Sequence, residues 1–449
     1  MEVVIKLSQF LLSLSLLIVL HELGHFIPAK LFKTKVEKFY LFFDIKYSLF
    51  KKKIGETVYG IGWLPLGGYV KIAGMIDESM DKEQMAEEPK PWEFRSKPAW
   101  QRLIIMLGGV TVNFILAFVI YIGIAFYYGE NYIPNSAVKD GIWIANPTME
   151  EIGLKTGDKI ISVDGEKVDN FYSVNEKLFV AKKVLVERDG KEQEISLPID
   201  FIGQLSESGK KSSIAELRVP FVVIATEEGS INHENVKPKD IVVNFNGNKV
   251  KYADEVIAAA QNLKGQTVNA VVLRDKKEVP VQLKIDKDGK FEITQALRLP
   301  LSNIEELKLY EVRREKYGFF ESFSVGTEKG YDKLVGYGKQ LKVIFTPKTG
   351  AYKEVGGFYA IFDIFPNTWS WEAFWNITAI LSIMLGVMNL LPIPALDGGH
   401  VMFLLFEMIT GRKPGDKFME YAQITGFVLL ITLVLLVNGN DIFKIITGK

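Results

Sequence analysis

The residues best suited to chemistry form one short stretch, residues 21–25 (HELGH), within an apolar N-terminal segment. The 449-residue chain has only four histidines, at positions 21, 25, 233 and 400. Residues four apart share one face of a helix, so both imidazoles can reach one zinc ion while Glu22 points at a water molecule bound to that metal. Ionisable residues inside an apolar helix are costly and usually serve a function. The stretch predicts His21 and His25 as zinc ligands and Glu22 as the catalytic base.

A catalytic zinc needs a third protein ligand and an open position for water. Residues 389–400 (NLLPIPALDGGH) contain the only acid and the only histidine at the end of a long apolar run. We choose Asp397 as the third ligand and His400 as the alternative. Pro392 and Pro394 should break the helix there, and irregular backbone at membrane depth requires protein or a water-filled cavity beside it. The alternative is that Asp397 binds no metal, and that it ends the span and faces the cytoplasm.

In this chain, apolar residues are concentrated in a few long segments. Residues are 48% hydrophobic overall, but long uncharged runs alternate with ordinary polar sequence, and a helix needs about 20 apolar residues to cross a bilayer. Four membrane-spanning helices are predicted, at residues 1–30, 101–128, 372–400 and 421–440. The first resembles a signal peptide but has charged residues where a small-residue cleavage site would lie, so we expect a retained signal-anchor helix.

Composition excludes several classes of function. Lys plus Arg equals Asp plus Glu, at 54 each, so the basic footprint that usually accompanies nucleic-acid binding is missing. There is no cysteine, which excludes disulfides, thiol catalysis and cysteine-ligated metals. Any metal must therefore be held by His, Asp or Glu.

The charge distribution predicts the orientation of the spans. Lysines dominate the loop between the first two spans, and the short loop after the third carries Arg412, Lys413 and Lys417. Because basic loops stay on the cytoplasmic side, residues 31–100 and 401–420 should be cytoplasmic. Both termini and residues 129–371 then lie on the opposite side, which in a bacterium is the periplasm.

The long segment between the second and third spans contains an internal repeat. Residues 154–168 (LKTGDKIISVDGEKV) align with residues 236–250 (VKPKDIVVNFNGNKV), and Arg-Asp pairs follow at 188–189 and 274–275. Each copy predicts a strand, a tight turn at Asp-Gly or Asn-Gly, and a second strand. We expect two related α/β domains, at 129–218 and 219–300, and a helical connector at 301–371.

The repeated stretch resembles the PDZ domain, closely in the first copy and less closely in the second, where Lys239 replaces the usual glycine. PDZ domains add an extended peptide to a sheet edge beside a helix. The resemblance implies that the two domains bind peptide termini. Alternatively, they act only as spacers or size filters.

Taken together, the motifs resemble the site-2 protease family, in particular its bacterial regulator of sigma-E branch. The matching segments occur in order along nearly the whole chain: HELGH, residues 65–71 (PLGGYVK), 101–102 (QR), 113–114 (NF), the two repeats, and 389–400. The resemblance implies that His21, His25 and Asp397 bind one zinc ion per chain and that Glu22 is the base. It also implies substrate binding by Asn389, to which we add Gly67, Gly68 and Asn113 from the matching segments.

The same resemblance suggests that residues 54–75, within the cytoplasmic region, form a re-entrant β-loop in the membrane. An amphipathic hairpin on the membrane surface is the alternative. The expected fold is a polytopic α-helical membrane protein, with four transmembrane helices and a membrane-associated β-loop, plus two periplasmic PDZ-like α/β domains.

The expected function is zinc-dependent hydrolysis of peptide bonds within transmembrane segments, in the inner membrane of a bacterium. Single-span membrane proteins, such as anti-sigma factors or remnant signal peptides, are the expected substrates, and the lipid bilayer is the other partner. The alternatives are a PDZ-bearing membrane scaffold with a non-catalytic metal site, a membrane-anchored protease with its zinc outside the bilayer, and a transporter.

Overall fold

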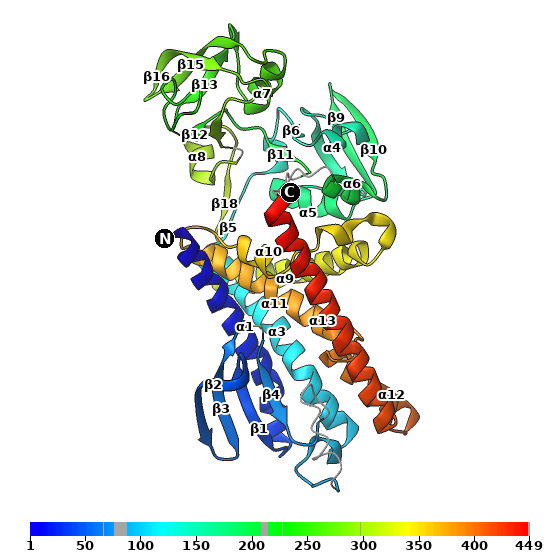
Figure 1. The fold of residues 1–449 in the computed structure, drawn as a ribbon. Coiled ribbons are helices and arrows are strands. Elements are labelled where there is room, and N and C mark those ends of the chain that lie inside the picture. Colours follow the sequence, from blue (N-terminus) through cyan, green and yellow to red (C-terminus); the bar gives the residue numbers. More distant parts are fainter. Residues whose placement is uncertain (66, 76–87, 208–213, 227, 297, 448–449) are drawn as a thin grey trace. The chain divides into compact units, whose positions relative to one another are not determined.

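The computed structural model describes residues 1–449 except 66, 76–87, 208–213, 227, 297 and 448–449. Residues 76–87 belong to the predicted cytoplasmic region 31–100, so that part of the region lies outside the described residues. The chain forms two compact units (Figure 1), the first from Met1–Gly129, Lys316–Leu341 and Val355–Lys449, the second from Glu130–Glu315 and Lys342–Glu354.

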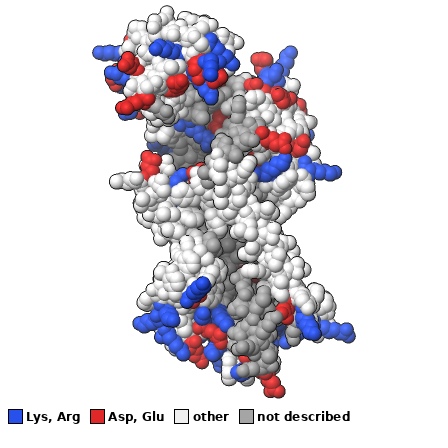
Figure 2. Space-filling view, viewed as in Figure 1, with Lys and Arg blue, Asp and Glu red and all other residues white. Residues whose placement is uncertain are grey.

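Four helices of the first unit are long and apolar enough to cross a membrane, as predicted: α1 (Glu2–Leu31), α3 (Ala99–Tyr127), α11 (Trp371–Leu390) and α13 (Asp416–Thr447). Helix α3 is central and packs against α1, α11 and α12 (Asp397–Thr410). On the face shown in Figure 2, uncharged surface covers these helices, and charged side chains gather at the end that carries strands β1–β4 and the turn between α12 and α13. The chain is therefore a multi-pass membrane protein.

The third apolar stretch, predicted as a span over 372–400 with a break at Pro392 and Pro394, is interrupted at that place. Helix α11 ends at Leu390, and α12 begins at Asp397 after six irregular residues that include Pro392 and Pro394. Proline lacks a backbone N–H and cannot continue the helix, which explains the break. The following segment, 401–420, was expected to be a loop, but its apolar first half continues α12 as far as Thr410.

A four-stranded sheet follows α1 and packs beside it. Its strands are β1 (Val36–Leu41), β2 (Phe43–Ile54), β3 (Thr57–Leu64) and β4 (Tyr69–Ile72), in the order β2-β3-β1-β4. The sheet therefore starts well before the β-loop expected at 54–75, because the aromatic and β-branched residues before residue 54 also form strands. Strand β4 pairs only with β1 among the described strands, which leaves its other side as an edge.

The remaining elements of the first unit are shorter or lie beside the spans. They are the 3-10 helix η1 (Phe94–Ser96), most of α9 (Phe319–Ile344) and α10 (Phe358–Asp363). Gly326 and Gly330 bring α9 close to Ile122 and Phe118 of α3. The side chains of Asn438 and Asp441 on α13 accept hydrogen bonds from backbone N–H groups at the start of α10.

The second unit contains the two sequence repeats. The first repeat contains β5 (Glu130–Tyr132), η2 (Asn135–Ala137), β6 (Ile142–Trp143), α4 (Pro147–Ile152), β7 (Lys159–Val163), β8 (Glu166–Lys167), η3 (Phe171–Ser173), α5 (Val174–Phe179), β9 (Lys183–Arg188), β10 (Lys191–Ser196), α6 (Phe201–Glu207) and β11 (Glu216–Leu217). The second contains β12 (Val223–Thr226), β13 (Ile241–Phe245), β14 (Asn248–Lys249), α7 (Ala253–Gln261), β15 (Thr267–Arg274), β16 (Lys277–Lys284) and β17 (Ile293–Gln295). The connector adds α8 (Leu301–Glu306), β18 (Arg313–Glu315), η4 (Pro347–Thr349) and η5 (Ala351–Glu354).

The two repeats have the same sheet topology. The strand order is β10-β9-β7-β8 in the first and β16-β15-β13-β14 in the second, and each sheet lies over its own apolar core. Both predicted tight turns are present, because Asp164-Gly165 and Asn246-Gly247 all have positive φ angles, between 48° and 85°. Lys239 adopts a φ of 74° where Gly157 has 97°, so the second copy makes this turn without glycine. That these domains are PDZ domains remains a prediction.

Each repeat also buries one aspartate at the same position. Asp158 is 0% exposed, and Arg188 donates to both of its carboxylate oxygens at 2.6 and 2.7 Å. Asp240 is 1% exposed, and Arg274 donates to it at 2.8 and 2.6 Å. Both carboxylates also accept a backbone N–H three residues earlier, at 2.8 Å. These buried charges are therefore fully paired within each repeat.

Candidate metal centre

His21 and His25 lie one turn apart on α1, both buried, with ring centroids 4.9 Å apart. They face α3, where a glycine makes room for them, because a Cβ atom at Gly109 would collide with Nε2 of His25 and with the His21 ring. Immediately before His25 and Gly109 in the chain, Gly24 and Gly108 bring the two helix backbones into direct contact, and a side chain at either position would run into the other helix. Small residues allow this close approach of membrane helices.

Asp397, the first residue of α12, meets both histidines. Its Oδ2 atom lies 3.4 Å from Nε2 of His21 and 3.3 Å from Nε2 of His25, and the two Nε2 atoms are 3.3 Å apart. Tetrahedral zinc with bonds of about 2.0–2.1 Å to nitrogen and oxygen separates its ligand atoms by about 3.3–3.4 Å. The three atoms therefore already have the spacing of three corners of a zinc tetrahedron.

The hydrogen bonding of these groups also fits a metal. Nδ1 of His25 lies 2.8 Å from the backbone carbonyl oxygen of Ile105, so Nδ1 carries the proton and Nε2 presents a lone pair. Oδ2 of Asp397 is buried and makes no hydrogen bond within the described part of the chain. A buried carboxylate without a donor is costly, and a cation between the three atoms would remove that cost. Among the described residues, His21, His25 and Asp397 are grouped as a candidate metal site.

The segment before Asp397 is held from two sides. A Cβ atom at Gly398 or Gly399 would collide with the backbone between Leu390 and Pro394, so the two glycines let the chain fold back on itself. Helix α13 closes the other side, where Gln423 accepts the Ala395 N–H at 3.2 Å and Gly426 abuts the carbonyl of Pro394. Ala395 needs such support, because its φ of 83° is unusual for a residue with a side chain.

An ion pair fixes α12 against α3. Arg102, 8% exposed, donates to Glu407 at 2.6 Å and to the Lys97 carbonyl at 2.9 Å. Glu407 is on α12, so this bond ties the helix that begins at Asp397 to the helix that cradles the histidines. Arg102 was matched to the family by sequence, but its partner could not be predicted.

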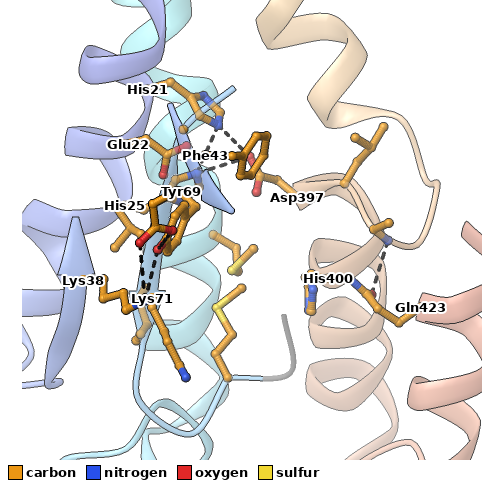
Figure 3. Close-up of a pocket in the computed structure, with 18 residues that line it drawn as sticks. His21, Glu22, His25, Lys38, Phe43, Tyr69, Lys71, Asp397, His400 and Gln423 are labelled. Atoms are coloured by element: carbon orange, nitrogen blue, oxygen red, sulfur yellow. Dashed lines mark hydrogen bonds and ion pairs between the residues drawn. The ribbon is translucent and has the colours of Figure 1, made fainter. Parts of the chain in front are cut away.

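The three groups open onto a pocket that Glu22 also lines (Figure 3). One wall comes from α1 and the sheet, and the opposite wall from α12 and α13. All four residues of strand β4, Tyr69–Ile72, line the pocket, together with Gly68 just before the strand. The described residues therefore place the Glu22 carboxylate, a candidate metal site and the edge strand β4 around one cleft, a combination suited to hydrolysis of an extended peptide.

The other predicted site residues take different positions. Gly68 lies against α1, where a Cβ atom would meet Ile18 and Glu22, and Gly67 lies against the Phe43 ring. The amide nitrogen of Asn389 is 3.3 Å from Nε2 of His21, and that of Asn113 is 3.0 Å from Nδ1. Asn113 is 0% exposed and does not appear among the pocket-lining residues that the structure describes. His400, the alternative ligand, lines the pocket further along α12, apart from the three converging groups (Figure 3).

Sequence reasoning missed several residues around the site. Lys38 and Asp44 line the pocket and both approach the Tyr69 hydroxyl, Lys38 at 3.3 Å as donor and Asp44 at 2.8 Å as acceptor. Gln423 was overlooked as well. Its signal was available, because an amide within an apolar span is unusual and commonly functional.

Comparison with known proteins agrees with this chemistry. The chain matches the family described as "Peptidase family M50" over residues 9–433. It is 28% identical to a putative zinc metalloprotease of Fusobacterium nucleatum, over 96% of this chain and 97% of the relative, and 29% identical to one of Campylobacter jejuni, over 98% and 94%. It is 24% identical to the regulator of sigma-E protease of Escherichia coli, over 98% of each chain.

Proposed function

The chain belongs to peptidase family M50, and we propose that this metalloprotease is a zinc-dependent intramembrane endopeptidase, which cuts other proteins within their membrane-spanning segments. One observation carries the proposal: Nε2 of His21, Nε2 of His25 and Oδ2 of Asp397 converge at 3.3–3.4 Å beside Glu22 on an apolar helix. The names of the relatives support zinc as the metal.

In this mechanism His21, His25 and Asp397 would hold zinc beside the pocket that Glu22 lines. Zinc held there supplies Lewis-acid chemistry, polarising a carbonyl and making water a better nucleophile at neutral pH. Glu22, next to His21 in the chain, accepts the proton of the attacking water and later donates it to the departing amine. Asn389, whose amide nitrogen lies 3.3 Å from Nε2 of His21, is proposed to donate a hydrogen bond to the substrate carbonyl.

A membrane-spanning substrate must unwind before it can react, because a helix hides its peptide groups in internal hydrogen bonds. We propose that the unwound segment pairs with the edge of β4, which would satisfy its backbone groups in a medium without water. Small or helix-breaking residues near the cut site should then favour cleavage. Equal cleavage of strongly helical segments would contradict this step.

The partners follow from the same proposal. Single-span membrane proteins, including anti-sigma factors and remnant signal peptides, are the proposed substrates, in the inner membrane of a bacterium. The two repeats and both termini are proposed to be periplasmic, with the repeats binding peptide termini or excluding substrates that retain bulky outer domains.

The second candidate is a membrane scaffold with a non-catalytic metal site. Glu22 distinguishes the two functions, because a purely structural zinc site needs no base. Glu22→Gln should retain zinc while cleavage of a single-span substrate falls by about 10²–10⁴-fold. The control is Glu2→Gln, the same change at the exposed first turn of α1, which should leave both zinc and cleavage unchanged. Undiminished cleavage by Glu22→Gln would contradict the proposed mechanism.

A further inference from the structure

Asn113 lies directly behind the first metal ligand. It is on α3, fully buried, and its side-chain amide nitrogen is 3.0 Å from Nδ1 of His21. Its backbone carbonyl accepts a hydrogen bond from Ser382 of α11 at 2.7 Å, so the residue is held where three helices meet. The amide therefore has a fixed position relative to the His21 ring.

The metal requirement decides which ring nitrogen of His21 carries the proton. Nε2 is the nitrogen that faces Asp397 and His25, so Nε2 must offer its lone pair to the metal. A neutral imidazole carries one proton, which then sits on Nδ1. Nδ1–H is a donor and needs an acceptor, yet the amide nitrogen now nearest to it is also a donor.

The missing acceptor is on the same side chain. Oδ1 of Asn113 is buried and has no hydrogen-bond partner among the residues described. The oxygen and nitrogen of an asparagine amide are nearly equal in size, and their assignment follows from the hydrogen bonds they make. A half-turn of the amide places Oδ1 about where the nitrogen is and lets it accept the proton of Nδ1.

We propose that Asn113 is a positioning residue for zinc, whose Oδ1 atom accepts the Nδ1–H of His21 and thereby holds Nε2 free to bind the metal. This inference rests on the proposed zinc site. It gives Asn113 a different role from the substrate binding first expected, and His25 has the same arrangement, with the Ile105 carbonyl as its acceptor. Such outer partners orient metal-binding histidines, and their loss typically weakens metal binding about 10–100-fold.

Two substitutions of similar size test the role of the oxygen. Asn113→Leu removes the acceptor and should weaken zinc binding about 10–100-fold, measured on the full chain in detergent by competition with a chromogenic chelator. Asn113→Asp keeps an acceptor and should bind zinc within about threefold of the unmodified protein or more tightly. If Asn113 only packed the helices, or donated to Nδ1, the aspartate variant would lose at least as much affinity as the leucine variant. That result would overturn the inference.

Gln9→Leu is the matched control. Gln9 is also a fully buried amide between helices, and it donates to the Pro366 carbonyl at 3.0 Å, three turns of α1 away from His21. Its loss should leave zinc affinity unchanged. If Asn113→Leu does not fold, the aspartate variant decides alone, since a loss of tenfold or more contradicts an acceptor role. An unmodified chain that binds no zinc would instead overturn the metal site itself.

Discussion

Carboxylates with buried oxygen atoms occur in both units of the molecule, but they are neutralised in different ways. In the second unit, Asp158 and Asp240 each face an arginine that donates two hydrogen bonds, and each also caps a backbone N–H. In the first unit, Oδ2 of Asp397 faces the Nε2 atoms of His21 and His25 and makes no hydrogen bond to any residue that the structure describes. The first arrangement is complete within the chain, whereas the second is complete only with a cation.

Whether a carboxylate has hydrogen-bond donors within the chain therefore distinguishes a structural carboxylate from a functional one without reference to sequence motifs. A buried, fully bonded Asp-Arg pair fixes a fold and leaves no group free for chemistry. A buried carboxylate whose neighbours are also electron donors destabilises the fold, and it is retained where a bound ion supplies the missing charge. We therefore predict that stabilisation by zinc depends on Asp397 and does not depend on Asp158 or Asp240.

Breaking an Asp-Arg pair should have the largest effect on stability. Arg188→Met leaves the carboxylate of Asp158 buried without its partner and should cost about 3–5 kcal/mol. Hydrogen exchange of β7 and β9 in the full chain would locate the loss in the first repeat. Zinc affinity should not change, and a variant that weakened zinc binding would contradict the separation of the two kinds of carboxylate.

Removing zinc should have a somewhat smaller effect, confined to the first unit. With free zinc at about 100 times its Kd, bound metal stabilises the folded state by about 2.7 kcal/mol, and a chelator removes that contribution. Thermal unfolding with and without the chelator would measure this loss of stability, and hydrogen exchange of α1 and α12 would locate it.

Asp397→Asn should abolish this dependence on zinc, whereas Asp158→Asn should preserve it. Stabilisation by zinc that persisted in Asp397→Asn would mean that the ion binds elsewhere. The comparison of the two carboxylates would then fail.

The smallest predicted effect arises from a difference between the two repeats. Lys239, next to buried Asp240, adopts the left-handed conformation that Gly157 adopts in the first repeat. Because a side chain costs about 1 kcal/mol or more in that region, Lys239→Gly should stabilise the second repeat by up to about 1 kcal/mol. Hydrogen exchange of β13 and β15 would report it. A destabilised variant would show that the lysine side chain makes a compensating contact.

The catalytic motif and the four spans could be predicted because they depend on short-range patterns. The spacing of His21 and His25 implied a shared helical face, and Asp397 was the only acid in a long apolar run. Contacts between helices distant in sequence could not be predicted in this way. Periodicity does not indicate that Asn113 meets His21, that Gln423 supports Ala395, or that Glu407 is the partner of Arg102, because each contact depends on how the helices cross.

The boundaries of elements were less predictable where two tendencies compete. The segment 401–420 was expected to be a loop, but its apolar first half continues α12 to Thr410. The lysine-rich segment after α1 indicated an exposed loop, yet its aromatic residues form β1 and most of β2. In both cases the local chemistry of single residues overrode the average over the segment.

The glycine contact between α1 and α3 bears on how this protein tolerates mutation. Gly24, Gly108 and Gly109 have no side chain to donate, accept or ligate, yet a single added methyl group would force α1 away from α3 or intrude on the histidine rings. In a library of all single substitutions, these three positions should tolerate as little change as the proposed zinc ligands His21, His25 and Asp397. Catalytic competence in this chain therefore depends on empty volume as much as on functional groups.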